Sequence, residues 1–355
     1  MKRAGIDRRN GRAVGMRLLV AAAALSACDI PTSAPILEPR FVIPGTNTAV
    51  GVEALLPPGV TFMPGAFAVR LSNSVSSWTL GELCDGCEVV NGQVVPKPAY
   101  TVTLTTDVPL PARVLSAVIR GGALTLRVAN NLSIDPIRPS GGTGGELLVV
   151  VEAGGEVLAR RTYTGNLPAA SITDIEVPLQ PGRVTGSLHV MVTIRSPAGD
   201  PVRVDTQEYV MVAAVPSTPI EMTSASIRVV NQPIETSFTS LDLRDIDETT
   251  RDQVRDGALV LRFENPFAAT GDLQLTVTPA EGEAITKELE PIPPGSSVQR
   301  VPFTGEEMQR LLGSLVSISA AGAVNQSDGR GVTIEPSDSL LIRADLDLTI
   351  TTDAN

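Results

Sequence analysis

The sequence predicts an all-β protein built from tandem immunoglobulin-like or fibronectin-like β-sandwiches. Two observations carry this prediction. Short segments that alternate apolar and polar residues occur about seven times in each half of the chain, separated by turn residues. The second half also repeats the sequence of the first, strand for strand, which indicates two copies of one domain.

The first 27 residues form an export signal. Six basic residues and one acidic residue precede the apolar run Leu18–Leu25, which is far shorter than the roughly 20 residues a membrane span needs. The adjacent segment Leu25-Ser-Ala-Cys28 resembles the lipobox of bacterial lipoproteins. The resemblance implies cleavage between Ala27 and Cys28, and diacylglycerol on the thiol of Cys28. Arg8 and Arg9 leave a twin-arginine signal open as an alternative, and a start at Met16 leads to the same mature chain.

Residues 28–40 are predicted to be a tether. Three prolines, Pro31, Pro35 and Pro39, lie in this segment without a hydrophobic period, which is typical of an extended linker. We therefore expect the protein to stand on the outer side of a bacterial membrane, attached to the bilayer through acylated Cys28. Asp29 follows the cysteine and leaves the choice between inner and outer membrane open.

Charge restricts the possible partners. Residues 1–27 hold six of the 28 basic and one of the 39 acidic residues, so the mature chain has 22 against 38 and a formal net charge of −16. Such a chain repels phosphate backbones and anionic headgroups, which argues against nucleic acid as a partner and against electrostatic adhesion to the bilayer. Two or three acyl chains would therefore supply the attachment.

Residues 41–98 are predicted to be a β-rich N-terminal segment, either a unit of its own or additional strands of the next domain. It contains the motif Cys84-Asp-Gly-Cys87. Asp-Gly is a favoured two-residue hairpin turn, so we expect the cysteines to face each other across a hairpin and to form a disulfide in an oxidising compartment. A redox pair would need a helix after the motif, and a zinc site would need more ligands than the single histidine and two cysteines provide.

The repeat defines the two sandwich copies, over residues 99–217 and 218–355. Residues 120–130 match residues 255–265 at seven of eleven positions. In both segments alternate residues are apolar, which places Arg127 and Arg262 on the opposite face of the strand. Further matches follow in the same order: 147–151 with 273–277, 177–179 with 301–303, 186–188 with 313–315, and 210–214 with 340–344.

The copies differ in two places. The first has a loop insertion at 133–142, rich in proline and glycine. The second has a predicted short helix that begins with a capping box of Thr304 and Glu307 and ends before Gly313. The segment 259–267, which ends in Asn265-Pro-Phe, resembles a strand of LEA14-like sandwich domains and implies the same fold class.

We expect no catalytic site, cofactor or metal. Motifs for nucleotide binding, α/β-hydrolases, zinc proteases and the Ser-x-x-Lys pair are missing. The one histidine, His189, is expected on the polar face of a strand. The acidic residues between 242 and 256 alternate with arginines in a predicted salt-bridged connection, and Asp345 and Asp347 are expected on the solvent face of the last strand.

The expected function is therefore a non-catalytic binding or structural module for envelope proteins. Carbohydrate binding is the alternative, because many surface sandwiches bind sugars. It would need an aromatic patch, for which Trp78, Tyr100 and Tyr209 are the candidates. A paired-carboxylate hydrolase is a further alternative, since two acids distant in the chain can converge in a cleft.

Overall fold

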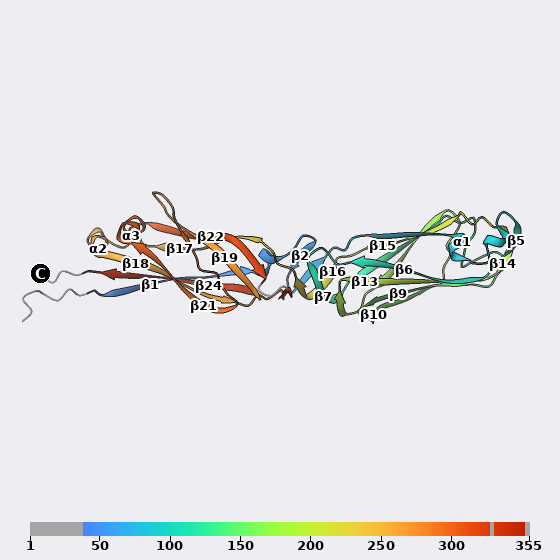
Figure 1. Ribbon diagram of the computed structural model, residues 1–355, viewed down its shortest axis with the longest axis horizontal. Helices are drawn as coiled ribbons and strands as arrows, with labels where there is room; N and C mark the ends of the chain where they lie inside the picture. The colour runs from blue at the N-terminus through green and yellow to red at the C-terminus, as the bar shows by residue number, and fades with distance from the viewer. Residues whose placement is uncertain (1–37, 327–329, 352–355) are drawn as a thin grey trace, which may run out of the picture.

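The computed structural model describes residues 38–326 and 330–351. The fold is all-β, as the sequence predicts, and Figure 1 shows an elongated molecule with one sandwich at each end and a smaller sheet between them. We call the sandwich that contains both described chain ends the terminal sandwich and the other the distal sandwich. In the described residues no helix is long and apolar enough to cross a bilayer.

The distal sandwich consists of two four-stranded antiparallel sheets. Their strand orders are β11-β8-β15-β4 and β10-β9-β13-β6. The strands are β4 (Ser74–Thr79), β6 (Tyr100–Pro109), β8 (Ala123–Asn130), β9 (Glu146–Ala153), β10 (Glu156–Tyr163), β11 (Ser171–Pro178), β13 (Ser187–Ser196) and β15 (Tyr209–Pro216).

The terminal sandwich has the same topology. Its sheets run β21-β18-β24-β1 and β20-β19-β22-β17. The strands are β1 (Arg40–Gly51), β17 (Gln232–Asp242), β18 (Val254–Asn265), β19 (Ala269–Pro279), β20 (Ile285–Glu288), β21 (Gly295–Thr304), β22 (Leu315–Gln326) and β24 (Ser339–Ile350).

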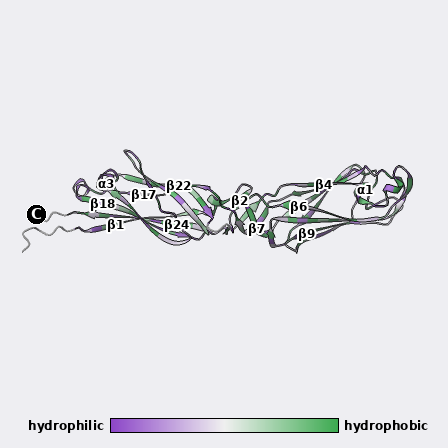
Figure 2. Cartoon of the chain, in the orientation of Figure 1, coloured by the Kyte–Doolittle hydropathy of each residue, from purple (hydrophilic) through white to green (hydrophobic). Residues whose placement is uncertain are grey.

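The sequence repeat coincides with this structural repeat. The matched segments 120–130 and 255–265 lie mainly in β8 and β18, which occupy the same place in their sheets, although the first two residues of 120–130 belong to β7. The other matches fall on or next to equivalent strands. Leu126 and Leu261 are buried in their cores, whereas Arg127 and Arg262 lie on the outer faces. Hydrophobic and hydrophilic residues accordingly mix along the strands of both sandwiches (Figure 2).

The two copies are nested instead of following one another. The first strand of the terminal sandwich is β1, which pairs with β24 from Arg40↔Thr349 to Gly51↔Ser339. All strands of the distal sandwich lie between β1 and β17 in the chain, so this copy is inserted into the other one. The segment 41–98 is therefore divided: β1 belongs to the terminal sandwich, and β4 is the first strand of the distal one.

A six-stranded sheet joins the two sandwiches. Its order is β12-β7-β16-β3-β2, and β23 also pairs with β16. The strands are β2 (Val60–Met63), β3 (Ala66–Val69), β7 (Val114–Gly121), β12 (Gly182–Thr185), β16 (Ile220–Ile227) and β23 (Val332–Ile334), and the 3-10 helix η1 (Val52–Leu55) precedes β2. The core of the distal sandwich continues through this sheet to Phe267 and Val324 of the terminal sandwich. We therefore expect the two sandwiches to be mechanically coupled.

Short helices lie at the two ends of the molecule. In the terminal sandwich α2 (Glu248–Gln253) and α3 (Gly305–Leu311) flank β18 and β21. The predicted capping box of α3 is present, since Glu307 N donates to Thr304 Oγ1 at 3.3 Å and Thr304 N donates to Glu307 Oε2 at 2.9 Å. At the distal end lie α1 (Leu80–Leu83), the 3-10 helix η2 (Glu88–Val90) and a two-stranded sheet of β5 (Val94–Lys97) and β14 (Gly199–Arg203).

Candidate functional site

The predicted lipidation and cleavage residues, Cys28 and Ala27, lie outside the described residues. The description begins at Glu38, two residues before β1. Glu38 forms an ion pair with Arg255 at the start of β18, so the described chain enters the terminal sandwich at the end where β24 finishes.

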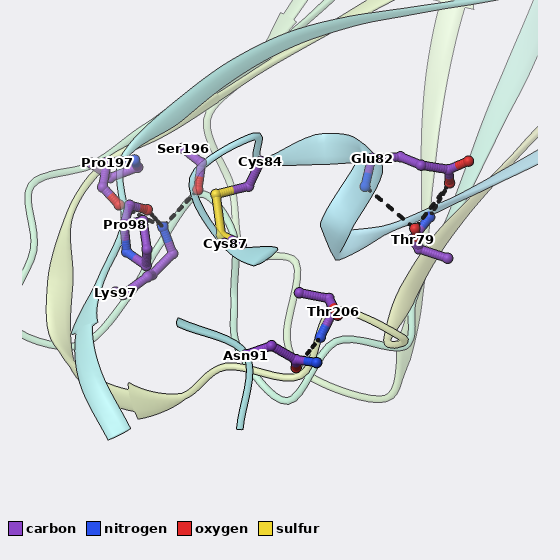
Figure 3. The surroundings of a disulfide bond; sticks show 10 residues. All are labelled: Thr79, Glu82, Cys84, Cys87, Asn91, Lys97, Pro98, Ser196, Pro197 and Thr206. Carbon is purple, nitrogen blue, oxygen red and sulfur yellow. Dashed lines mark hydrogen bonds between the residues drawn. A yellow bond between two sulfur atoms is a disulfide. The ribbon is translucent and has the colours of Figure 1, made fainter. Parts of the chain in front are cut away.

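The structure joins Cys84 and Cys87 by a disulfide at the distal end, with the Cα atoms 5.4 Å apart (Figure 3). Both sulfur-bearing side chains are buried, so the bond closes a rigid loop and is not exposed for thiol exchange. The surrounding loop is fixed to the chain before β15, because Gly81 N donates to Thr206 O at 3.2 Å and Gly92 N donates to Val204 O at 2.7 Å.

The prediction that the two cysteines face each other across a hairpin is wrong. The cysteines lie between α1 and η2, not between two strands. The cause is a second capping box: Glu82 N donates to Thr79 Oγ1 at 3.3 Å, and Thr79 N donates to Glu82 Oε2 at 2.7 Å. This pair ends β4 at Thr79 and starts a helical turn, and it follows the same Thr-x-x-Glu pattern that predicted α3.

A buried lysine lies near the disulfide and was missed by sequence reasoning. Lys97 is 1% exposed. Its Nζ donates to Ser196 Oγ at 2.6 Å, to Pro197 O at 2.5 Å and to Pro98 O at 3.3 Å, and lies 5.3 Å from the centre of the Tyr100 ring. Burial lowers the pKa of Lys97 to about 8, partly opposed by the charge of Asp135. Lys97 and Ser196 are 99 residues apart in the chain, so no motif could reveal the pair.

A serine beside a lysine of lowered pKa has the composition of a catalytic dyad, but this pair is placed differently. Ser196 is as buried as Lys97, and its hydroxyl donates to Pro136 O at 2.5 Å. A nucleophile must reach the substrate carbonyl, and here both groups are enclosed by backbone. The cluster instead ties β5, the end of β13 and the inserted loop 133–142 together.

His189 lies on the outer face of β13, as predicted, while Leu188 and Val190 face the core. Its Nδ1 is 2.7 Å from Asp107 Oδ1, and both side chains are exposed. Among the described residues no hydroxyl or thiol forms a hydrogen bond with this histidine.

The acidic residues between 242 and 256 have structural roles. Asp242 pairs with Arg244, whose hydrogen bonds lower the pKa of Asp242 to about 2, and Asp247 caps α2 by accepting a hydrogen bond from Thr250 N at 2.8 Å. Within residues 38–326 and 330–351 no cluster of three potential ligands could hold a metal ion.

Asp345 and Asp347 depart from the expectation of an open solvent face. They lie on the outer face of β24, but arginines of the same sheet cover them. Arg262 and Arg343 pair with Asp345, and Arg40 and Arg300 pair with Asp347. The alternation of apolar and polar residues along β24 predicted the correct face. The side chains that cover the two aspartates depend on the order of strands in the sheet, which a local sequence pattern does not contain.

The candidate aromatic patch is not formed. Trp78 packs partly against the core, opposite Val210, whereas the neighbouring Tyr209 points to the outer face. Tyr100 lies over Lys97 within the distal cluster. A sugar platform needs exposed rings on one surface, so these three residues do not favour carbohydrate binding.

Comparisons with known proteins leave the family open. No protein-family model matches the chain, and no curated protein is similar to it. A candidate secreted protein from Parabacteroides distasonis is similar in structure at 9% identity and a TM-score of 0.34, over 87% of this chain and 99% of that one. The tandem CBM22 domains of Xyn10C from Paenibacillus barcinonensis match at 8% identity and a TM-score of 0.17, over 88% and 99% of the two chains. The structure of the infectious bursal disease virus Gx strain matches at 10% identity and a TM-score of 0.22, over 90% of this chain and 73% of that one. TM-scores this low carry no information on activity or ligand.

Proposed function

We propose that the protein is a lipid-anchored, non-catalytic module outside the cytoplasm that holds a binding surface for an envelope protein away from the bilayer. The observation that carries the proposal is the pairing of β1 with β24. It places both described chain ends at one end of the elongated molecule, with the junction sheet and the distal sandwich beyond them (Figure 1). A tether from Cys28 would therefore leave the rest of the molecule projecting from the membrane.

The described ionisable groups support a non-catalytic role. Lys97 and Ser196 are enclosed, His189 pairs with an exposed aspartate on a sheet face, and the buried aspartates are covered by arginines. Each group has a structural partner that accounts for its position. The net charge of −16 expected for the mature chain supports a protein partner over nucleic acid.

Anchoring is tested by labelling. In a bacterial host supplied with labelled palmitate, the wild type should incorporate label and sediment with membranes, whereas Cys28→Ala should do neither, because the acyl chains have no other attachment point. A Cys84→Ala/Cys87→Ala double variant is the control and should be labelled like the wild type. Equal labelling of wild type and Cys28→Ala would contradict the anchor.

Partner binding is tested by capture. The mature chain from Ile30 onward, immobilised without its lipid, should retain a reproducible protein from an envelope extract, and that protein should capture this chain in the reverse experiment. An unrelated β-protein of similar negative charge is the control for electrostatic retention. Substrate turnover that disappears when two converging acids are replaced would overturn the non-catalytic proposal.

A further inference from the structure

A groove of about 660 Å³ lies at the junction of the two sandwiches. Its volume is in the range of pockets that hold ligands or peptide side chains. One wall consists of β2 and the connection that leads into it, and the other of the turn before β7 and the start of β17. The lining of the groove includes Glu53, Val60, Phe62, Arg113 and Gln232.

Strand β2 is the end strand of the junction sheet, so one of its edges has no strand partner. Arg70 N donates to Gly59 O at 3.0 Å, which marks Gly59 and Arg70 as a hydrogen-bonded pair. Hydrogen-bonded and non-hydrogen-bonded pairs alternate along an antiparallel ladder, so Phe62 belongs to a non-hydrogen-bonded pair. The peptide N–H and C=O of Phe62 therefore point away from β3, toward the free edge. The Phe62 side chain is 38% exposed, and its ring packs edge-on against Phe67 with centroids 6.5 Å apart, which holds it in place.

The residues of this edge lack the prolines, charges and bulges that protect many end strands from pairing with other chains, although β2 is only four residues long and the end strand β4 lacks these features too. Natural edges carry prolines, charges or bulges. Such features occur in the end strands β1 (Pro44 and a bulge), β21 (Pro302), β11 (Pro178), β10 (Arg160, Arg161) and β12 (Arg183). The four residues of β2, Val60–Met63, include no proline or charge, and they border the groove.

The groove also has a cation without an acidic partner. Arg113 donates from Nη1 to Gln232 Oε1 at 3.3 Å, and among the described residues it forms no ion pair. Its backbone has a positive φ of 75°, a left-handed conformation that is unfavourable for a non-glycine residue. Arg228 N donates to Arg113 O at 2.7 Å and holds this turn at the groove wall. Glu53 also lines the groove but forms no ion pair with Arg113, so within the described residues the guanidinium is left to pair with a carboxylate of a ligand.

We propose that the groove binds an extended segment of a partner protein, which adds to β2 as a further strand. The segment places an apolar side chain beside Phe62 and a carboxylate opposite Arg113. Main-chain hydrogen bonds to the edge would supply affinity, and the two side-chain positions would supply specificity. This inference rests on the proposed function, because it names the site and the kind of segment through which the partner binds.

The test uses a phage-displayed library of linear 12-residue peptides, selected on the immobilised chain from Ile30 onward. Enriched peptides should alternate apolar and polar residues and share an acidic residue at one position. Phe62→Asp should weaken their binding at least about tenfold, as expected for a central anchor residue. Val298→Asp is the matched control, since Val298 is an exposed apolar residue of another end strand, and its effect should stay below about twofold.

Repeating the selection on the Arg113→Glu variant distinguishes specific strand addition from nonspecific peptide binding. This variant keeps a long side chain at the same turn, so the shared acidic residue should be replaced by a basic one. Urea midpoints equal to that of the wild type would show that each variant is folded. Peptides that bind Phe62→Asp as well as the wild type, enrichment without an acidic position, or no enrichment would each overturn the groove assignment.

The envelope capture distinguishes this failure from failure of the proposed function. If the captured partner binds wild type and Phe62→Asp equally, the groove assignment fails and the binding module stands. If no partner is captured by the wild type, the proposed function itself fails.

Discussion

Replacing Asn130 with alanine is expected to lower the free energy of unfolding by about 3–5 kcal/mol, because several buried backbone groups lose their partners at once. Asn130 is 1% exposed at the end of β8. Its Nδ2 lies 2.8 Å from Ile134 O, 2.7 Å from Leu167 O and 3.1 Å from Pro168 O, so its two N–H groups are shared among three carbonyls, and its Oδ1 accepts from Leu132 N at 3.1 Å. Alanine supplies none of these hydrogen bonds.

The repeat provides a second site for the same experiment. Asn265, at the equivalent end of β18, donates to Ala269 O at 2.9 Å and Pro293 O at 3.2 Å and accepts from Phe267 N at 3.0 Å. Asn265 is less deeply buried than Asn130, at 8% against 1% exposed, so Asn265→Ala should cost about 2–4 kcal/mol.

Urea denaturation of the chain from Ile30 onward measures both effects. Asn131→Ala is the control, since Asn131 is the adjacent amide but is exposed, and its effect should stay within about 0.5 kcal/mol. A loss below about 1 kcal/mol for Asn130→Ala would show that water replaces the amide and that the end of this strand is open to solvent.

The match between these two amides is one of the seven identities that made the repeat visible in the sequence. Asn130 and Asn265 end matched strands, and each holds the backbone that follows its strand. Alternation along β8 and β18 then predicted the buried face correctly, because period two is a local property of a strand. The capping box of Thr304 and Glu307 predicted α3 for the same reason.

Features that depend on distant strands were not predictable in this way. Pairing of Arg40 with Thr349 brings together the two ends of the described chain, and no local pattern contains that information. The nesting, the arginines that cover Asp345 and the contact between Lys97 and Ser196 all follow from strand order. The helix α1 is a different case, since its signal, Thr79 and Glu82, was present but was interpreted as part of a hairpin.

The wild type should become more stable relative to Lys97→Met as the pH rises from 7 to 9.5. The pKa of Lys97 is lowered to about 8 in the folded protein, from 10.5 when exposed, because burial disfavours the ammonium. Between these two values the unfolded state binds more protons than the folded state, so the free energy of unfolding increases with pH. For this shift the increase by pH 9.5 is about 2 kcal/mol.

Methionine is the suitable replacement because it keeps the apolar stem of Lys97 and has no titrating group. At pH 7 the variant loses the hydrogen bonds to Ser196 and Pro197 but also loses the cost of a buried charge, so the difference at one pH is not diagnostic. The change with pH of the difference in unfolding free energy between the two proteins reports on the titration of the Lys97 ammonium alone. It is measured by urea denaturation of both proteins at half-unit steps of pH.

The measurement should end at pH 9.5, because Tyr100 acts in the opposite direction above that value. Burial raises the pKa of Tyr100 to about 12, so the folded state holds its proton after the unfolded state has released it, and stability falls as pH rises beyond 10. Tyr100→Phe, combined with each Lys97 form, removes this effect and keeps the aromatic ring. If the difference between wild type and Lys97→Met is constant from pH 7 to 9.5, the ammonium is solvated in the folded protein. The cluster that joins β5, β13 and the loop 133–142 would then be open to water, and the enclosed position that argues against a Ser196 nucleophile would be lost.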